Sequence, residues 1–189
     1  MEHSEILPNL FLIGAARSAT TSISKMLSDH RDVYLPVLKE PHFLASHQNK
    51  TFGRDNVCVS NLENYKKLYK GSEAVKYRLD ASTSSLYFLE KFVANAHDLG
   101  LNEGKIIIVL RNPVDRAISH YRMLVRRGIE RRDPTTALLT QDPDLIARRW
   151  GFDYMGVSTY SSQLIHLSKF WRRENIQIFL FEDILHEGF

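Results

Sequence analysis

The stretch that decides the fold of this 189-residue chain is Leu10-Phe-Leu-Ile-Gly14-Ala-Ala-Arg17-Ser-Ala-Thr20-Thr-Ser-Ile23. An apolar run ends at Gly14, a short polar loop follows, and a helical pattern begins near Ala19. A strand, loop and helix in this order aim several backbone N–H groups at one point, and the helix adds the positive end of its dipole. The stretch therefore predicts a binding site for a phosphate group.

The composition is that of an ordinary globular protein, with 43% apolar and 25% charged residues. The length suits one domain with a real core, which we expect to span residues 1–189. A net charge of +3 suits an anionic ligand but is too small to predict a nucleic-acid partner. The single cysteine, Cys58, excludes an internal disulfide and a cysteine-rich zinc site, and no other cluster predicts a metal.

Targeting signals are absent from the sequence. No apolar run approaches the roughly 20 residues of a membrane span, and residues 1–5 lack the basic start of a signal peptide. We therefore expect a cytoplasmic protein, although a fragment cut from a membrane-anchored enzyme of the Golgi lumen would have the same pattern. The glycosylation triplet at 49–51 is interpreted as a chance match.

Apolar strands alternate with amphipathic helices along the chain. We expect strands at 9–13, 33–35, 75–80, 105–110 and 176–181, the last one buried, and helices at 19–30, 61–69, 86–98, 113–127 and 160–173. Residues 129–156 are interpreted as an irregular, charged excursion over the surface. The pattern predicts a P-loop-like three-layer α/β/α domain with a mainly parallel central sheet. In such a fold the loop after Ile13 and the turn after Leu110 both follow strand ends and can therefore face one crevice.

The loop departs from the phosphate-binding template G-x-x-x-x-G-K-[ST]. Gly14 and Thr21 match its ends, but Ala19 replaces the second glycine and Thr20 replaces the lysine. Without that lysine the loop can hold a phosphate but is poorly equipped to cleave a nucleoside triphosphate. Arg17 lies within reach of a bound anion instead. Because glycine would allow a closer approach than Ala19, we expect weaker binding or a shifted loop.

A second candidate anion site is Arg111-Asn-Pro-Val-Asp-Arg-Ala-Ile-Ser119-His-Tyr-Arg122. Arg111 follows a predicted strand, and Ser119 lies two turns into the next helix. A guanidinium fork and a hydroxyl at these places can bind one further phosphate. Alone, the motif could equally be a helix with solvated arginines. Together with the loop, it indicates a doubly phosphorylated nucleotide.

With both motifs in place, the chain resembles the sulfotransferases that use 3′-phosphoadenosine 5′-phosphosulfate (PAPS), nearest the Golgi heparan sulfate enzymes and their bacterial relatives. The loop at 14–22 resembles the family's 5′-phosphosulfate loop, and residues 109–121 resemble its 3′-phosphate motif. Lys39-Glu-Pro-His-Phe43 resembles the segment that carries the catalytic base, and residues 154–183 resemble a later helix–strand unit.

The resemblance implies a role for each matching residue. The donor's 5′-phosphosulfate would be held by the loop residues Arg17, Ser18, Ala19, Thr20, Thr21 and Ser22. Arg17 stands where many relatives have a lysine that stabilises the leaving phosphate. Arg111 and Ser119 would bind the 3′-phosphate.

The acceptor side of the reaction is implied by the same resemblance. Glu40 would be the general base as a hydroxyl or amine of a carbohydrate or small molecule attacks sulfur in line, without a metal. His42 is a second candidate base or an acceptor contact. Glu40 has a competing interpretation as a surface carboxylate paired with Lys39.

Departures from the family pattern keep alternatives open. Relatives continue past the last strand into a Gly/basic loop that closes over the nucleotide, and no such loop follows Asp183 here. The chain could be C-terminally truncated, another segment could replace that loop, or nucleotide binding could be weak. Some relatives have an acidic residue where Ala45 stands, so the acceptor is not predicted. A P-loop nucleotide kinase, with magnesium at the acidic end of 176–183, is one alternative. A non-catalytic nucleotide-binding module with a loop weakened by Ala19 is the other.

Overall fold

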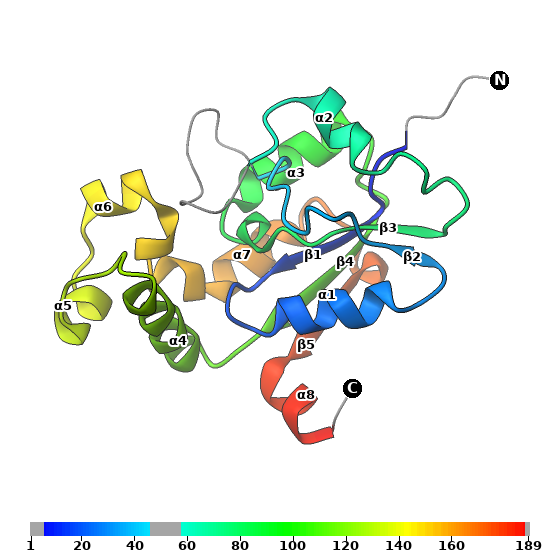
Figure 1. The fold of residues 1–189 in the computed structure, drawn as a ribbon. Helices are drawn as coiled ribbons and strands as arrows, with labels where there is room; N and C mark the ends of the chain where they lie inside the picture. The colour runs from blue at the N-terminus through cyan, green and yellow to red at the C-terminus, as the bar shows by residue number, and fades with distance from the viewer. Residues whose placement is uncertain (1–5, 46–57, 188–189) are drawn as a thin grey trace.

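The structure, a computed structural model, describes residues 6–45 and 58–187, and the triplet at 49–51 lies outside them. A five-stranded sheet has the order β2-β3-β1-β4-β5, and each pair of neighbours is parallel (Figure 1). The strands are β1 (Leu10–Gly14), β2 (Val33–Tyr34), β3 (Tyr77–Asp80), β4 (Lys105–Leu110) and β5 (Ile176–Leu180). The parallel sheet that the sequence predicts is confirmed.

Helices cover both faces of this sheet (Figure 1). They are α1 (Thr20–Ser28), α2 (Leu62–Lys67), α3 (Leu89–Asp98), α4 (Pro113–Arg126), α5 (Pro134–Leu139), α6 (Pro143–Arg148), α7 (Tyr160–Leu167) and α8 (Phe181–Glu187). Short 3-10 turns lie at η1 (Thr83–Ser85), η2 (Trp150–Phe152), η3 (Gly156–Ser158) and η4 (Arg173–Asn175). The three-layer α/β/α architecture is therefore also as expected.

Strand β1 is buried along its whole length because its side chains enter two cores. Phe11 and Ile13 belong to the larger core, with residues of α3 and α7. Leu10 and Leu12 belong to the second core, together with Ile23 of α1. A strand between two helical layers has no polar face, which explains its uninterrupted apolar sequence. The rigid strand fixes the start of the loop that follows it.

Helix α4 begins as the sequence predicts. The Asn112 side chain accepts hydrogen bonds from the N–H groups of Val114 at 3.0 Å and Asp115 at 3.3 Å, and Pro113 occupies the first turn. The chain leaves the helix through Gly128, whose φ is +67°. Because the cap directly follows β4, the face of α4 is aligned with the end of that strand.

The interpretation of residues 129–156 as irregular is wrong, because the segment contains α5 and α6. Asp133 and Asp142 cap these helices by accepting hydrogen bonds from the backbone N–H groups of Thr136 and Leu145. In each case proline is the first helical residue. An Asp-Pro pair thus marked a helix start, since proline needs no N–H there and aspartate satisfies the next ones.

The expected burial of the last strand is also wrong. Strand β5 lies at the edge of the described sheet, and its side chains Phe179 and Leu180 are 42% and 49% exposed. Two helix boundaries differ from the expected ones by three residues or more. Helix α7 ends at Leu167 where we expected 173, and α3 begins at Leu89 after the turn η1 where we expected 86.

Gly14 ends β1 in close contact with Leu86, whose N–H donates to the carbonyl of Ile13 at 2.9 Å. A Cβ on Gly14 would lie 2.7 Å from the Cβ of Leu86, which is too close for two carbon atoms. We predict that Gly14→Ala lowers the free energy of unfolding in urea by about 1–3 kcal/mol. It should also weaken binding of adenosine 3′,5′-bisphosphate in calorimetry, because the loop must move.

The control is Gly100→Ala. An added Cβ there meets no atom within 4 Å, although its φ of +67° is unfavourable for alanine. This variant should lose some stability and keep its affinity for the nucleotide. Equal effects of the two variants on binding would contradict the role of the Gly14–Leu86 contact.

Candidate active site

The loop after β1 turns tightly back on the sheet. The N–H of Ala15 donates to the carbonyl of Val109 in β4 at 2.7 Å, and the N–H of Ser18 donates to the carbonyl of Ala15 at 3.2 Å. The first helical hydrogen bond of α1 runs from Ile23 to Ala19 at 3.1 Å. The N–H groups of residues 20–22 precede that bond and have no acceptor within the helix. The loop and the first turn of α1 therefore present backbone donors at the carboxyl end of the sheet.

Two residues of this loop have left-handed backbone conformations. Arg17 has a φ of 74° and Ala19 a φ of 58°, and Ala19 is the N-cap of α1 without a side-chain hydrogen bond. A left-handed conformation costs a residue with a Cβ about 1–2 kcal/mol. The glycine that the phosphate-loop template has at position 19 would avoid this cost. Ala19 thus keeps the shape of the loop, with strain.

Arg17 joins the loop to the motif after β4. Its Nε donates to the Ser119 hydroxyl oxygen at 3.3 Å, and its carbonyl accepts from Arg111 Nη1 at 3.2 Å. Burial lowers the pKa of Arg17, and the nearby charges of Arg126, Arg111 and Arg127 lower it further. The two predicted anion sites therefore meet at one place, where positive charge accumulates.

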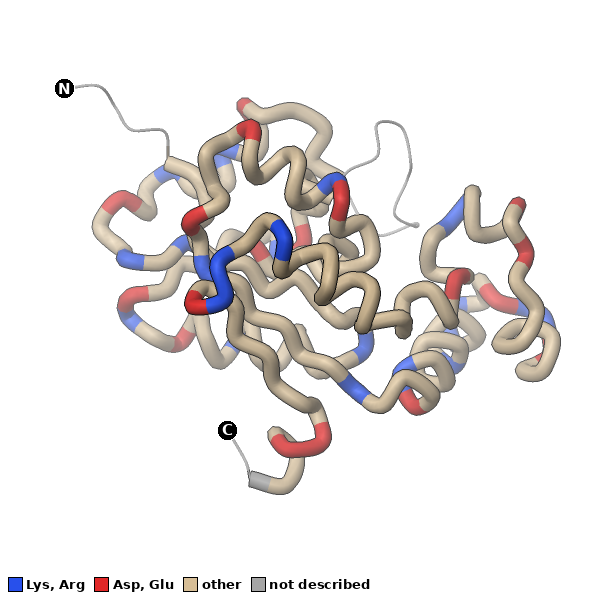
Figure 2. Tube along the Cα trace, turned by 180° about the vertical axis from the view of Figure 1, so that it is seen from behind, with Lys and Arg blue, Asp and Glu red and all other residues tan. Residues whose placement is uncertain are grey.

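A hollow of about 270 Å³ lies along one face of α4. It is lined by Arg111, Asp115, Ile118, Ser119, Arg122 and Arg126. Figure 2 shows Lys and Arg positions on α4 and on the strand end that leads into it. The Arg111 guanidinium packs over the Phe181 ring at 4.6 Å, and its buried Nε has no partner among the described residues. These residues, with the buried and unpartnered Ser18 hydroxyl, fit an anionic ligand better than a neutral one.

The opposite face of α4 is anchored by a buried arginine. Arg116 donates to the Ser158 hydroxyl at 2.6 Å and to the Tyr154 carbonyl at 2.7 Å, and its Nη1 lies 3.1 Å from His120 Nδ1. Burial lowers the pKa of Arg116 to about 10. Burial also lowers the pKa of His120 to about 3, and the positive charge of Arg116 contributes to this second shift. The neutral His120 thus belongs to the support of α4 and points away from Ser119.

Glu40 lies half-buried beside the segment that follows β3. Lys39 Nζ donates to its Oε1 at 2.8 Å, and the Thr83 hydroxyl donates to its Oε2 at 2.9 Å. Burial by itself would raise the pKa of Glu40, but Lys39, with smaller contributions from His42 and Thr83, holds it below its usual value. The carboxyl is therefore ionised at neutral pH. The Lys39 pair expected of a surface carboxylate is present, and Thr83 adds a contact that the sequence did not predict.

His42 is fully buried next to Glu40. Its Nε2 lies 3.7 Å from Glu40 Oε2, and its Nδ1 lies 2.7 Å from the Ser84 hydroxyl oxygen. Burial lowers the pKa of the imidazole, although the charge of Glu40 opposes the shift. In this conformation the ring faces protein groups, which favours a supporting role beside Glu40 over a direct acceptor contact.

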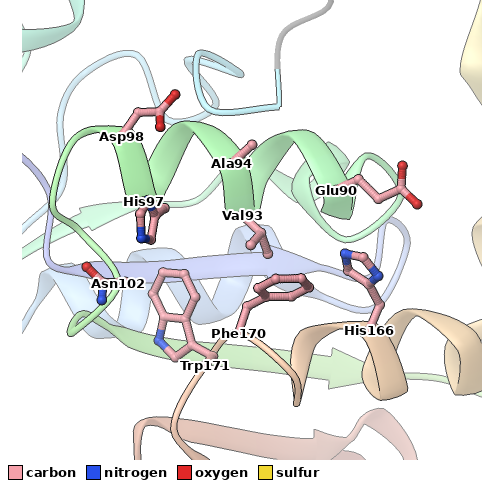
Figure 3. Close-up of a pocket in the computed structure, with 9 residues that line it drawn as sticks. All are labelled: Glu90, Val93, Ala94, His97, Asp98, Asn102, His166, Phe170 and Trp171. Carbon is pink, nitrogen blue, oxygen red and sulfur yellow. The ribbon is translucent and has the colours of Figure 1, made fainter.

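A hollow of about 540 Å³ lies elsewhere, between α3 and α7. Figure 3 shows Val93, Phe170 and Trp171 in it, flanked by His97 and His166. None of the predicted site residues lines this hollow. The site is better located by the three neighbouring strand ends of β3, β1 and β4, where the segments with Glu40, Arg17 and Arg111 meet.

The fold and these strand-end segments define an α/β protein with a candidate anion site, formed by the segments of Arg17 and Arg111, and an ionised carboxylate, Glu40, that contacts the segment after β3. The sequence model of the sulfotransferase domain matches residues 7–185. The crystal structure of a sulfotransferase from Alicyclobacillus acidocaldarius matches with a TM-score of 0.86 and 29% identity, over 95% of this chain and 75% of that one. No curated protein matches significantly. The chain belongs to the sulfotransferase family.

Further features of the described residues concern metal ligands, membrane-spanning helices and the acidic end of β5. Within residues 6–45 and 58–187, no group of three or more His, Cys, Asp or Glu residues is arranged to hold a metal ion. Over the same ranges, no helix is long and apolar enough to cross a membrane. Glu182, which the kinase alternative assigns to magnesium, accepts the backbone N–H of Asn112 at 2.8 Å.

The strain at Ala19 yields a prediction. Ala19→Gly should raise the free energy of unfolding by about 0.5–1 kcal/mol, because relief of the left-handed strain exceeds the entropy that glycine gains in the unfolded chain. It should also tighten binding of adenosine 3′,5′-bisphosphate, measured by calorimetry. Ala16→Gly is the control, since Ala16 has no positive φ and should only lose stability. Equal destabilisation by both changes would contradict the strain.

Proposed function

We propose that this chain transfers a sulfuryl group from PAPS to a hydroxyl or amine of a carbohydrate or small-molecule acceptor. The observation that carries the proposal is the pair of contacts made by Arg17, to Ser119 and to Arg111. These contacts bring together the two predicted anion sites at neighbouring strand ends, which supports one shared site for a ligand with two anionic ends. PAPS has anionic groups at its 3′ and 5′ ends, which match such a site. Residues 1–189 then act as one sulfotransferase unit.

On the donor side, the residues divide between the two anionic ends. The backbone and hydroxyl groups of residues 17–22 hold the 5′-phosphosulfate, and Arg111 and Ser119 hold the 3′-phosphate. Arg17 lies between them and neutralises charge on the leaving phosphate as the sulfur–oxygen bond breaks. Arginine does this through fixed, forked donors and does not act as a proton donor.

On the acceptor side, Glu40 is the general base. The acceptor's oxygen or nitrogen attacks sulfur in line with the leaving phosphate oxygen, and its proton passes to the Glu40 carboxylate. General base catalysis of this kind contributes about 10²–10⁴-fold. The contacts of His42 with Glu40 and Ser84 support a role in holding the base, without direct proton transfer.

The donor end is tested by Arg111→Ala. We predict that it weakens binding of adenosine 3′,5′-bisphosphate by about 1.5–3 kcal/mol, the value of a hydrogen bond between charged groups. Binding of adenosine 5′-monophosphate should change little, because that ligand lacks the 3′-phosphate. Arg31→Ala is the matched control, since Arg31 is 91% exposed and distant in the fold. Equal losses for both nucleotides would show that Arg111 does not contact the 3′-phosphate.

The reaction is tested with sulfur-35-labelled PAPS and a panel of a chitosan oligomer, a neutral oligosaccharide and 4-nitrophenol. We predict that Glu40→Gln lowers transfer about 10²–10⁴-fold while calorimetry shows unchanged affinity for adenosine 3′,5′-bisphosphate. Glu103→Gln, an exposed change outside the site, is the control. Full activity in Glu40→Gln would exclude this base. Tight nucleotide binding by the wild-type chain without transfer to any acceptor would favour a non-catalytic binding module.

A further inference from the structure

The segment that begins at the last residue of β3, residues 80–85, contacts Glu40 through Thr83, to which the proposed function assigns no role. The Thr83 side chain is 7% exposed, and its hydroxyl donates to Glu40 Oε2 at 2.9 Å. The Thr83 backbone N–H also points to this oxygen, at 3.4 Å. Lys39 Nζ holds the other carboxylate oxygen at 2.8 Å. Each oxygen of Glu40 thus has its own donor, and together these donors fix the plane of the carboxylate.

This segment is itself held by buried hydrogen bonds. Asp80 Oδ1 accepts the Ser82 N–H at 2.9 Å, and its Oδ2 accepts the Tyr65 hydroxyl at 2.6 Å. The Ser82 hydroxyl oxygen accepts the N–H of His42 at 2.9 Å. The backbone on both sides of the Glu40–Thr83 contact is therefore anchored to the same core. A donor on such a segment can hold a partner in one orientation.

We propose that Thr83 is a positioning residue for Glu40, whose hydroxyl orients the carboxylate that takes the acceptor's proton. The proposal rests on the proposed function and extends it to a residue outside the matched motifs. In the reaction the proton moves from the acceptor to Glu40, and Thr83 keeps its own proton. A misplaced base loses rate even when its chemical identity is unchanged.

The contact also has an electrostatic consequence. A hydrogen bond donated to a carboxylate favours the ionised form, so Thr83 contributes to the lowered pKa of Glu40. The other charged or titratable groups that face Glu40 are Lys39 and His42, with Asp80 behind the segment. Removing the hydroxyl should therefore raise the pKa of Glu40. Because the base must be ionised, the acid limb of activity should move to higher pH.

The test compares Thr83→Val, which replaces the hydroxyl by a methyl of similar size, with Thr83→Ser, which keeps the hydroxyl. Thr83→Ala removes the hydroxyl without adding a methyl and serves if valine prevents folding. Thr135→Val, at an exposed position of α5, is the matched control. The first readout is the Glu40 carboxyl pKa, from carbon-13 NMR of glutamate-labelled protein with Glu40→Gln as the assignment standard. The second is the pH profile of sulfate transfer from labelled PAPS.

We expect Thr83→Val and Thr83→Ala to raise the Glu40 pKa, to shift the acid limb of kcat/KM to higher pH, and to lower kcat about 10–100-fold. Thr83→Ser keeps the hydroxyl and should therefore stay close to the wild type in all three measurements. The affinity for adenosine 3′,5′-bisphosphate should be unchanged in every Thr83 variant. Thr135→Val should match the wild type.

An unchanged Glu40 pKa in the folded valine and alanine variants would overturn the proposal, even if activity fell. A loss of activity that serine does not rescue would also overturn it. If the wild-type chain transfers no sulfate, the proposed function fails, and with it the catalytic role of Thr83. The NMR titration would still decide whether Thr83 controls the ionisation of Glu40, so the two failures are distinguishable.

Discussion

The close approach of Gly14 to Leu86 is the constraint on which the site depends. With no Cβ at Gly14, the end of β1 lies directly against the segment that follows β3. The same end of β1 is tied to β4, through the hydrogen bond from Ala15 to Val109. The central strand thus joins its two neighbours at their carboxyl ends. The parallel pairing of β1 with β3 places the loop with Arg17 and the segment with Thr83 at one edge of the sheet, and this contact allows their close approach.

The charges at this edge are separated in a way that suits transfer of an anionic group. Positive charge gathers along α4 and the loop, where burial, followed by the charges of Arg126 and Arg111, lowers the pKa of Arg17. Such a cluster is unfavourable alone and is stabilised by an anion between its members. At the adjacent strand end, Glu40 is neutralised locally by Lys39. The carboxylate therefore does not cancel the field that would attract the donor.

The sequence predicted most of this arrangement because the decisive signals are local. The burial of β1, the glycine at its end and the Asn112-Pro113 start of α4 each follow from a few adjacent residues. The sequence could not predict contacts such as Thr83 with Glu40 or Arg111 with Phe181, since they join segments 43 and 70 residues apart. The helices α5 and α6 were missed for another reason. Their Asp-Pro caps were present, but the helices are too short to show hydrophobic periodicity.

The arginine at position 17 gives the two halves of the site different responses to pH. Burial and neighbouring arginines lower the pKa of Arg17, yet a guanidinium remains charged at any pH at which the fold survives. The donor end of the crevice is therefore permanently positive. Glu40 can lose its charge in acid, and its pKa depends on Lys39 and Thr83. In the proposed mechanism, acid would stop the transfer of the acceptor's proton to Glu40 before it weakened binding of the donor.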